Sequence, residues 1–302
     1  MKRILPILAV LCLLAMASCV KDSLENCPGK MHFYFSFLYG GVNRFFDMEK
    51  TDLSMRFYRQ DDPLRYREIN VDRSSISIQK PLTIEKTPDD ADSLEVVLWS
   101  RDERIEHTGA PETPLGEGGL HLKEITAGSG ICRPVDDLFY GRLKFDAADR
   151  YKRIDCTVPF VRAVSRIRVT MIPQTVEEGS EDAGIIPRPD DYVFHLLNTR
   201  NEINDNNITG GDKIVLQPDC YYDASSGNVK TDWFGAFSSN GEYLYVEVFI
   251  REQKVATFDC APIKLASVPG DNIDLIIDGH YVSPVMEVRV NGWKLANVHS
   301  NL

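Results

Sequence analysis

The sequence predicts an all-β protein in which two tandem β-sandwiches follow a lipidated tether. Apolar and polar residues alternate with period two in many short runs, which is typical of half-buried strands. Clusters of Gly, Pro, Asp and Asn separate these runs at short intervals, as they do in sandwiches and barrels. No long apolar stripe has a 3.6-residue period, so long helices are not expected.

The first 28 residues predict export and attachment to a membrane. Residues 1–18 form a signal peptide, in which a basic pair precedes an apolar run too short to span a bilayer. The small residues that lead to Cys19 are similar to the lipobox of bacterial lipoproteins, in which the cysteine thiol is acylated and the preceding peptide removed. Met16 stands where Leu is usual, and a plain cleaved signal with an unmodified Cys19 is the alternative. Residues 19–28 form the polar tether of a lipoprotein at the surface of the outer membrane.

The N-terminal sandwich is predicted for residues 29–159. Residues 31–38 form an aromatic first strand that ends at a Gly-Gly pair. Residues 94–99 are rich in apolar and β-branched residues, as expected for a strand at the centre of a sheet. A loop rich in Gly and Pro spans residues 107–119. The other strands of this unit are expected at residues 53–58, 66–71, 76–78, 120–125, 138–141 and 153–159.

The C-terminal sandwich is predicted for residues 160–302. Within its first strand, residues 160–171, apolar side chains alternate with Arg166 and Arg168, which therefore face away from the core. Further strands are expected at residues 192–196, 213–216, 233–237, 243–251, 255–260, 272–277 and 285–290.

Export also makes disulfides possible. Cys132 and Cys156 are candidates for one disulfide within a domain. Cys220 and Cys260 are candidates for a second, which leaves Cys27 over, although spacing alone does not fix the connectivity. No two of these cysteines have the CxxC spacing of a zinc site, so no metal is expected there.

Composition and motifs argue against nucleic-acid binding and against enzymatic activity. The net charge is -11 and basic residues do not cluster, whereas binding to phosphate needs clustered Lys and Arg. There is no GxSxG, HExxH or P-loop motif, so neither catalysis nor a cofactor is expected. His195 lies in an apolar strand and is interpreted as a core or rim residue. Asp205, Asn206 and Asn207 carry oxygens that could bind calcium, but they lack the full loop pattern and are predicted to form a loop.

Two motifs carry a resemblance to a known family. They are VDDLFYG at residues 135–141 and VPFVRAVSRI at residues 158–167. With the lipobox at Cys19 and the NCP triplet at residues 26–28, they resemble the FimB-like minor fimbrial lipoproteins of Bacteroidetes, which are fimbrium-anchoring subunits. The resemblance implies two transthyretin-like sandwiches, anchored by lipid at the base of a fimbrium. It also implies that the protein joins the fimbrial shaft subunits by β-strand addition and limits fimbrial length.

The resemblance leaves other identities open. In the related shaft subunits a protease cuts after an Arg near the N-terminus, and Arg44 is the candidate here. An anchor should keep this bond intact, whereas a shaft or tip subunit would not; an ordinary turn arginine is the other interpretation. A surface glycan-binding lipoprotein of a polysaccharide-uptake system would need exposed aromatic platforms. Trp99 and Trp233 lie in strand patterns and are predicted to be core residues, so Trp293 is the one tryptophan left that could form such a platform.

Overall fold

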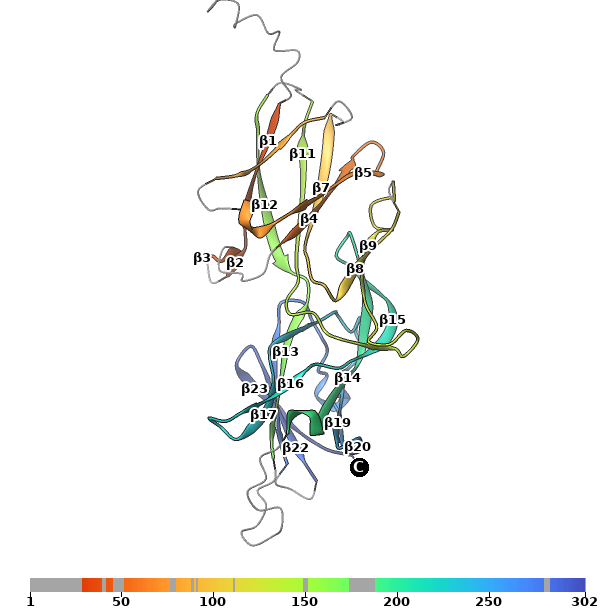
Figure 1. The fold of residues 1–302 in the computed structure, drawn as a ribbon, viewed down its shortest axis with the longest axis vertical. Coiled ribbons are helices and arrows are strands. Elements are labelled where there is room, and N and C mark those ends of the chain that lie inside the picture. The colour runs from red at the N-terminus through yellow and green to blue at the C-terminus, as the bar shows by residue number, and fades with distance from the viewer. Residues whose placement is uncertain are drawn as a thin grey trace, which may run out of the picture.

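The protein is all β, as predicted, and its strands are joined by loops and short 3₁₀ turns. Figure 1 shows two sandwiches arranged end to end along the long axis. Within the described part of the chain, no helix is long and apolar enough to cross a membrane. The computed structural model describes residues 29–39, 42–45, 52–76, 80–87, 90, 92–110, 112–148, 152–173, 188–279 and 283–301.

The N-terminal sandwich is built from one continuous sheet of seven strands. In chain order these are β1 (Lys30–Ser36), β4 (Leu53–Arg59), β5 (Arg65–Val71), β6 (Leu82–Glu85), β7 (Ser93–Ser100), β11 (Phe139–Asp146) and β12 (Ile154–Arg162). They follow the spatial order β5-β4-β7-β11-β12-β1-β6. Residues 154–159 of β12 pair in parallel with β1, whereas residues 160–162 pair with β11. Strand β12 therefore passes from one layer of the sandwich to the other, as corner strands do.

An aromatic cluster fills the core of the N-terminal sandwich. Phe33 of β1 meets Phe57 of β4 edge-on, with 6.2 Å between ring centroids. Phe35 of β1 stacks on Phe45 at 5.2 Å and lies 5.9 Å from Phe160 of β12. Because alternate side chains of a strand point to the same face, β1 places its apolar residues inside this cluster. The first strand is therefore an integral part of the core.

Two separate sheets pack against each other in the C-terminal sandwich. The first contains β8 (Ile105–Thr108), β9 (Gly119–Leu122), β10 (Ile131–Cys132), β14 (Tyr192–Asn204), β15 (Thr209–Leu216), β19 (Tyr245–Ile250) and β20 (Gln253–Asp259). The second contains β13 (Ser165–Ile172), β16 (Cys220–Asp223), β17 (Asn228–Thr231), β18 (Phe234–Ala236), β21 (Asn272–Asp278), β22 (Val285–Val290) and β23 (Trp293–His299). Ile167 and Val169 of β13 are buried between the sheets, and Arg166 and Arg168 face outward, so the predicted alternation is confirmed.

Residues 105–132 lie in the C-terminal sandwich, although the sequence assigned them to the N-terminal one. Strand β9 pairs with β14, and β10 pairs with β15. After β7 the chain leaves the first sandwich, adds these strands to the second, and returns through β11. The predicted boundary at residue 160 also falls inside β12. The two sandwiches are therefore interlocked by the path of the chain, which a linear division of the sequence does not capture.

Neither of the two expected disulfides forms in the structure, because all four described cysteines are free. Cys156 is buried in the N-terminal core, whereas Cys132 is buried in the C-terminal core. Cys220 begins β16 in one sheet, and Cys260 follows β20 in the opposite sheet. Burial raises the pKa of the Cys132 and Cys156 thiols to about 11, so both behave as small apolar side chains. Cys27 lies outside the described residues.

The contact between β9 and β14 leaves no room for a side chain at Gly119, where a Cβ would lie 2.2 Å from the carbonyl oxygen of Ile203. We expect Gly119→Ala to push the two strands apart and lower the free energy of unfolding by about 1–3 kcal/mol. Gly210→Ala on β15 is the matched control, because a Cβ there meets open space and should change stability by less than about 1 kcal/mol. Urea unfolding measures both, and equal losses would contradict the close approach.

Candidate functional site

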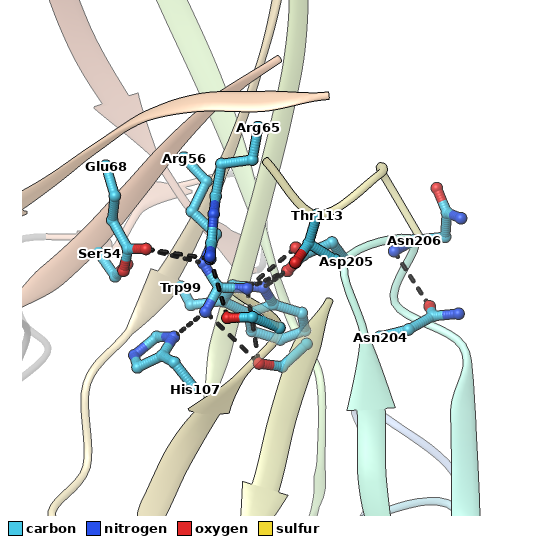
Figure 2. Close-up of polar contacts among 12 residues, drawn as sticks. Ser54, Arg56, Arg65, Glu68, Trp99, His107, Thr113, Asn204, Asp205 and Asn206 are labelled. Carbon is cyan, nitrogen blue, oxygen red and sulfur yellow. Dashed lines mark hydrogen bonds and ion pairs between the residues drawn. The ribbon is translucent and has the colours of Figure 1, made fainter. Parts of the chain in front are cut away.

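The two sandwiches meet at a polar junction that is closed to solvent. In β4 and β7, alternate residues point into the N-terminal core, and the residues between them point toward the C-terminal sandwich. The second set includes Arg56 and Tyr58 of β4 and Trp99 of β7, all fully buried. Figure 2 shows Arg56 and Trp99 beside Asp205, which lies at the tip of the β14–β15 hairpin. The junction therefore joins residues from distant parts of the chain.

Asp205 accepts hydrogen bonds from three side chains of the N-terminal sandwich. Arg56 Nη1 lies 2.8 and 2.9 Å from the two carboxylate oxygens of Asp205. Trp99 Nε1 donates to Oδ1 at 2.9 Å, and the Tyr58 hydroxyl donates to Oδ2 at 2.5 Å. The Tyr140 hydroxyl donates to the backbone carbonyl of Asp205 at 3.1 Å. The carboxylate is thus ion-paired and hydrogen-bonded at once, which is the condition for burying a charge.

The surroundings of Arg56 fix the protonation of its neighbours. Arg56 Nη2 contacts His107 Nδ1, and because Arg can only donate, Nδ1 must be the unprotonated acceptor. Burial, together with the charge of Arg56, lowers the pKa of His107 to about 4, so the imidazole is neutral at neutral pH. Burial and the charge of Asp205 raise the pKa of Tyr58 far above its usual value. The phenol therefore stays protonated and remains a donor.

A second group of polar contacts holds the hairpin tip in shape. Asn204 Oδ1 accepts hydrogen bonds from the backbone N–H groups of Asn206 and Ile208, both at 3.0 Å. The amide oxygen of Asn206 accepts a hydrogen bond from Arg142 Nη1 of β11 at 2.8 Å. Arg142 is itself ion-paired with Glu95 of β7. The tip is therefore presented to the N-terminal sandwich in a fixed conformation.

These contacts give the junction a structural role, because they hold the two sandwiches together. Both oxygens of Asp205 are engaged, and Arg56 and Asp205 are fully buried, so the pair is closed to a substrate. No group of three His, Cys, Asp or Glu side chains suited to a metal ion occurs in the described residues. If the sandwiches docked differently, one of these charges could be buried without its partner, which costs free energy. The ion pair therefore favours the observed docking.

The free sheet edges are the second candidate site, because an edge strand offers unpaired backbone N–H and C=O groups to a partner. Strand β5 is partly covered at Arg65, whose backbone pairs with the loop at residues 112–113. Strand β20 is partly covered at Thr257, which bridges to Asn301. Strand β23 pairs only with β22 in the described structure and exposes apolar side chains. Trp293 is 82% exposed and Leu295 is 50% exposed.

The structure places the residues predicted from the sequence in different surroundings. Cys19, like Cys27, lies outside the described residues. Arg44 is exposed just after the short β3 (Val42–Asn43), and its backbone N–H donates to the Phe37 carbonyl at 2.7 Å. His195 is half-buried on β14, with Nε2 3.2 Å from Gln217 Oε1.

Asp205 was predicted to lie in an ordinary loop, and the structure instead makes it the centre of the junction. Its partner Arg56 lies 149 positions away in the sequence, so no local pattern links the two. A lone acidic residue in a run of asparagines between two strands was the only available signal.

The three tryptophans also differ from one another. Trp99 is a core residue, as predicted. The prediction that Trp233 is a core residue is wrong, because β18 begins only at Phe234 and places that ring inside. Trp233 is half-buried outside the sheet, with the guanidinium of Arg168 4.6 Å from its ring centroid.

Residues 24–299 match the protein family described as fimbrillin-A associated anchor proteins Mfa1 and Mfa2. No curated protein sequence is significantly similar to the chain.

Several solved structures share the fold at low sequence identity. The fimbrial anchor protein Mfa2 from Porphyromonas gingivalis is 13% identical, with a TM-score of 0.62 over 91% of this chain and 100% of that one. A Bacteroides thetaiotaomicron protein described as polysaccharide-binding is 15% identical, with a TM-score of 0.60 over 92% and 99%. A Bacteroides ovatus protein described as an adhesin is 13% identical, with a TM-score of 0.59 over 91% and 95%. At these identities the likeness concerns the fold.

Replacing Asp205 by Asn should remove the nearest counter-charge of the buried Arg56 and leave Glu68, 3.7 Å from Nε, as its remaining carboxylate partner. We expect the free energy of unfolding to fall by about 3–5 kcal/mol, the cost of breaking a buried pair. The control is Asp155→Asn, which removes an ion pair to Arg153 whose side chains are both more than half exposed. That change should cost less than about 1 kcal/mol. Urea unfolding of both variants checks this, and similar small losses would show that the junction is not held by the pair.

The neutral state of His107 predicts how stability depends on pH. The folded pKa of about 4 lies below the ordinary value of 6.5, so the unfolded chain binds more protons in the interval between them. The free energy of unfolding should therefore fall as the pH drops from about 6.5 to about 4. His107→Gln should flatten this part of the profile. Urea unfolding at a series of pH values measures it, and an unchanged slope in the variant would refute the assignment.

Proposed function

The chain belongs to the family of fimbrillin-A associated anchor proteins, and from this membership we propose that it holds a fimbrium on the outer membrane. In this proposal the lipid on Cys19 fixes the protein to the membrane. The two sandwiches then form a rigid body that joins the last shaft subunit by β-strand addition and limits the length of the fimbrium. The observation that carries the proposal is the complete N-terminal sheet.

The first strand occupies the position that a donor strand would need. Strand β1 pairs with β12 on one side and with β6 on the other. Met31 and Phe33 are fully buried. Burying each such side chain contributes about 1.5–3 kcal/mol, so the strand is strongly held. A shaft subunit that loses its first strand gains an open groove, whereas this sandwich is already filled, as suits a subunit at the end of a polymer.

The bond after Arg44 is a poor site for cleavage in this conformation. Arg44 is exposed, but Phe45 is fully buried. Its ring stacks on Phe35 and packs at a tilt against Phe160, with centroids at 5.2 and 5.0 Å. A protease would have to pull this ring from the core before it could bind the bond in an extended conformation. Cleavage would also release β1 and open the N-terminal core. We therefore propose that the bond remains intact and that the lipid stays attached.

Strand β23 is the edge best suited to receive the neighbouring subunit. It is the last strand in the described residues and has seven residues, as many as the partly covered β5 and β20, against four in β6 and in β16 and two in β10. Main-chain pairing supplies affinity in strand addition, and exposed alternate side chains supply specificity. Trp293 and Leu295 are exposed on this strand, and Trp293 is the most exposed of the large apolar side chains in the described residues. In Figure 1, β23 lies in the lower sandwich, whereas β1 lies in the upper one.

Lipid attachment predicts a simple difference between two cysteines. Cys19→Ser should move the protein from the membrane fraction to the soluble fraction, because each buried methylene of the acyl chains contributes about 0.8 kcal/mol to anchoring. Cys27→Ser is the matched control and should leave the protein in the membrane. Cell fractionation and metabolic labelling with a fatty acid measure both. Membrane attachment that survives Cys19→Ser would rule out this anchor.

Attachment through β23 predicts that charges at this edge release fimbriae. Trp293→Lys combined with Leu295→Lys should reduce shaft capture, because charged edge residues oppose strand pairing. The fold should persist, since both side chains are exposed in the described structure. Val161→Lys is the control, because Val161 is also 50% exposed but lies on β12. Fimbriae retained on cells and shed into the medium are counted; normal retention by the double variant would exclude β23.

A further inference from the structure

A concave site of about 660 Å³ lies on the outer face of the second C-terminal sheet, and its lining ends at Gly292, just before β23. Strands β13, β21 and β22 form its floor. Trp233 and the loops at residues 270 and 291–292 form its rim. Three arginines and one aspartate line it, which makes it a cationic site in a chain with a net charge of -11.

Two of the three arginines are already paired. Arg168 is held by Asp274 of the neighbouring strand through contacts of 3.2 and 2.7 Å. Arg289 contacts Glu287 of its own strand at 2.6 Å. These ion pairs position the side chains and offset their charges. An anionic ligand would therefore be attracted less strongly by either of them than by an arginine without a close carboxylate.

Arg166 differs from the other two because its charge is poorly compensated. Its side chain makes no hydrogen bond to the described residues, and its Nε atom is buried without a hydrogen-bond partner. The nearest carboxylate, Asp137, lies 3.9 Å away and is engaged by Arg162 at 3.0 and 3.1 Å. Burial lowers the pKa of Arg166, which agrees with a cation short of partners. A guanidinium in this state gains most from a ligand carboxylate.

The rest of the site suits the ring of a sugar. The guanidinium carbons of Arg166 and Arg168 lie over the Trp233 ring, 5.3 and 4.6 Å from its centroid, within the range of cation–π contacts. Asn272 lines the site beside Arg166, its register partner on the adjacent strand. Its backbone N–H donates to Asn291 Oδ1 at 2.9 Å, whereas its side-chain amide makes no hydrogen bond to the described residues and offers both a donor and an acceptor for hydroxyl groups. The volume lies within the range of small-ligand pockets.

We propose that this pocket binds an acidic glycan through a carboxylate carried on a sugar ring, with Arg166 as the carboxylate ligand and Asn272 as a hydroxyl ligand. Uronic acids and sialic acids share this chemistry. The proposed site is independent of fimbrial attachment, because it uses neither Cys19 nor β23. It gives the protein a binding activity on the face of the C-terminal sandwich.

The test measures binding of the full-length lipoprotein in detergent to two acids and their uncharged counterparts. Trigalacturonic acid is compared with its methyl ester, and sialyllactose with lactose, by titration calorimetry. We expect at least one acid to bind about tenfold more tightly than its counterpart, because a charge-assisted pair to Arg166 is lost without the carboxylate. Arg166→Gln should weaken this binding about tenfold, and Arg153→Gln, in the other sandwich, should leave it unchanged.

The outcomes separate the alternatives. Preference for one acid identifies the sugar source, and preference for both shows that the carboxylate alone is recognised. Equal binding of an acid and its counterpart, or no binding of either acid, would overturn the proposal. Unchanged binding by Arg166→Gln would also overturn it. If no acid binds but Arg166→Gln abolishes capture of purified shaft subunit, the site belongs to a protein partner and the glycan proposal fails.

Discussion

The buried carboxylate of Asp205 sets the arrangement of the whole molecule. It belongs to the C-terminal sandwich, but its side-chain partners belong to the N-terminal one. A carboxylate without these partners would be buried at a cost of several kcal/mol, so the two sandwiches are stable in one docked arrangement. The path of residues 105–132 through the second sandwich adds to this constraint. Two modules that could have moved independently thus form one rod.

The end-to-end arrangement of the sandwiches and their strand order determine how a pulling force would pass through the protein. Tension between a lipid on Cys19 and a shaft at β23 would enter at the start of β1 and leave from the end of β12 toward β13. Because β1 and β12 are parallel, this loads their ladder in shear, so its hydrogen bonds share the force. From β13 the ladder continues through β21 and β22 to β23. The path of the force therefore begins at β1, which is paired on both sides, and ends at β23, which pairs only with β22 in the described structure.

The sequence predicted local structure well and long-range relations poorly. The alternation around Ile167 and Val169 predicted which face of β13 is buried, because a two-residue period is a local property. The docking of Asp205 onto Arg56 could not be predicted, since the two are joined only by the fold. The same limit affected the cysteines. Cys132 and Cys156 lie in different cores, whereas Cys220 and Cys260 belong to opposite sheets around one core. Trp233 was misassigned because a strand boundary one residue away decides whether its ring faces the core or the outer surface.

The mass of the native N-terminus, taken from protein isolated from the cells that produce it, is the most direct test of lipid anchoring. The account predicts that the chain begins at an acylated Cys19 and continues without a break through Arg44 and Phe45, so that β1 remains in the sheet. A chain that begins at Phe45 would lack both the lipid and the first strand. That result would contradict the anchor and would instead describe a subunit of the shaft.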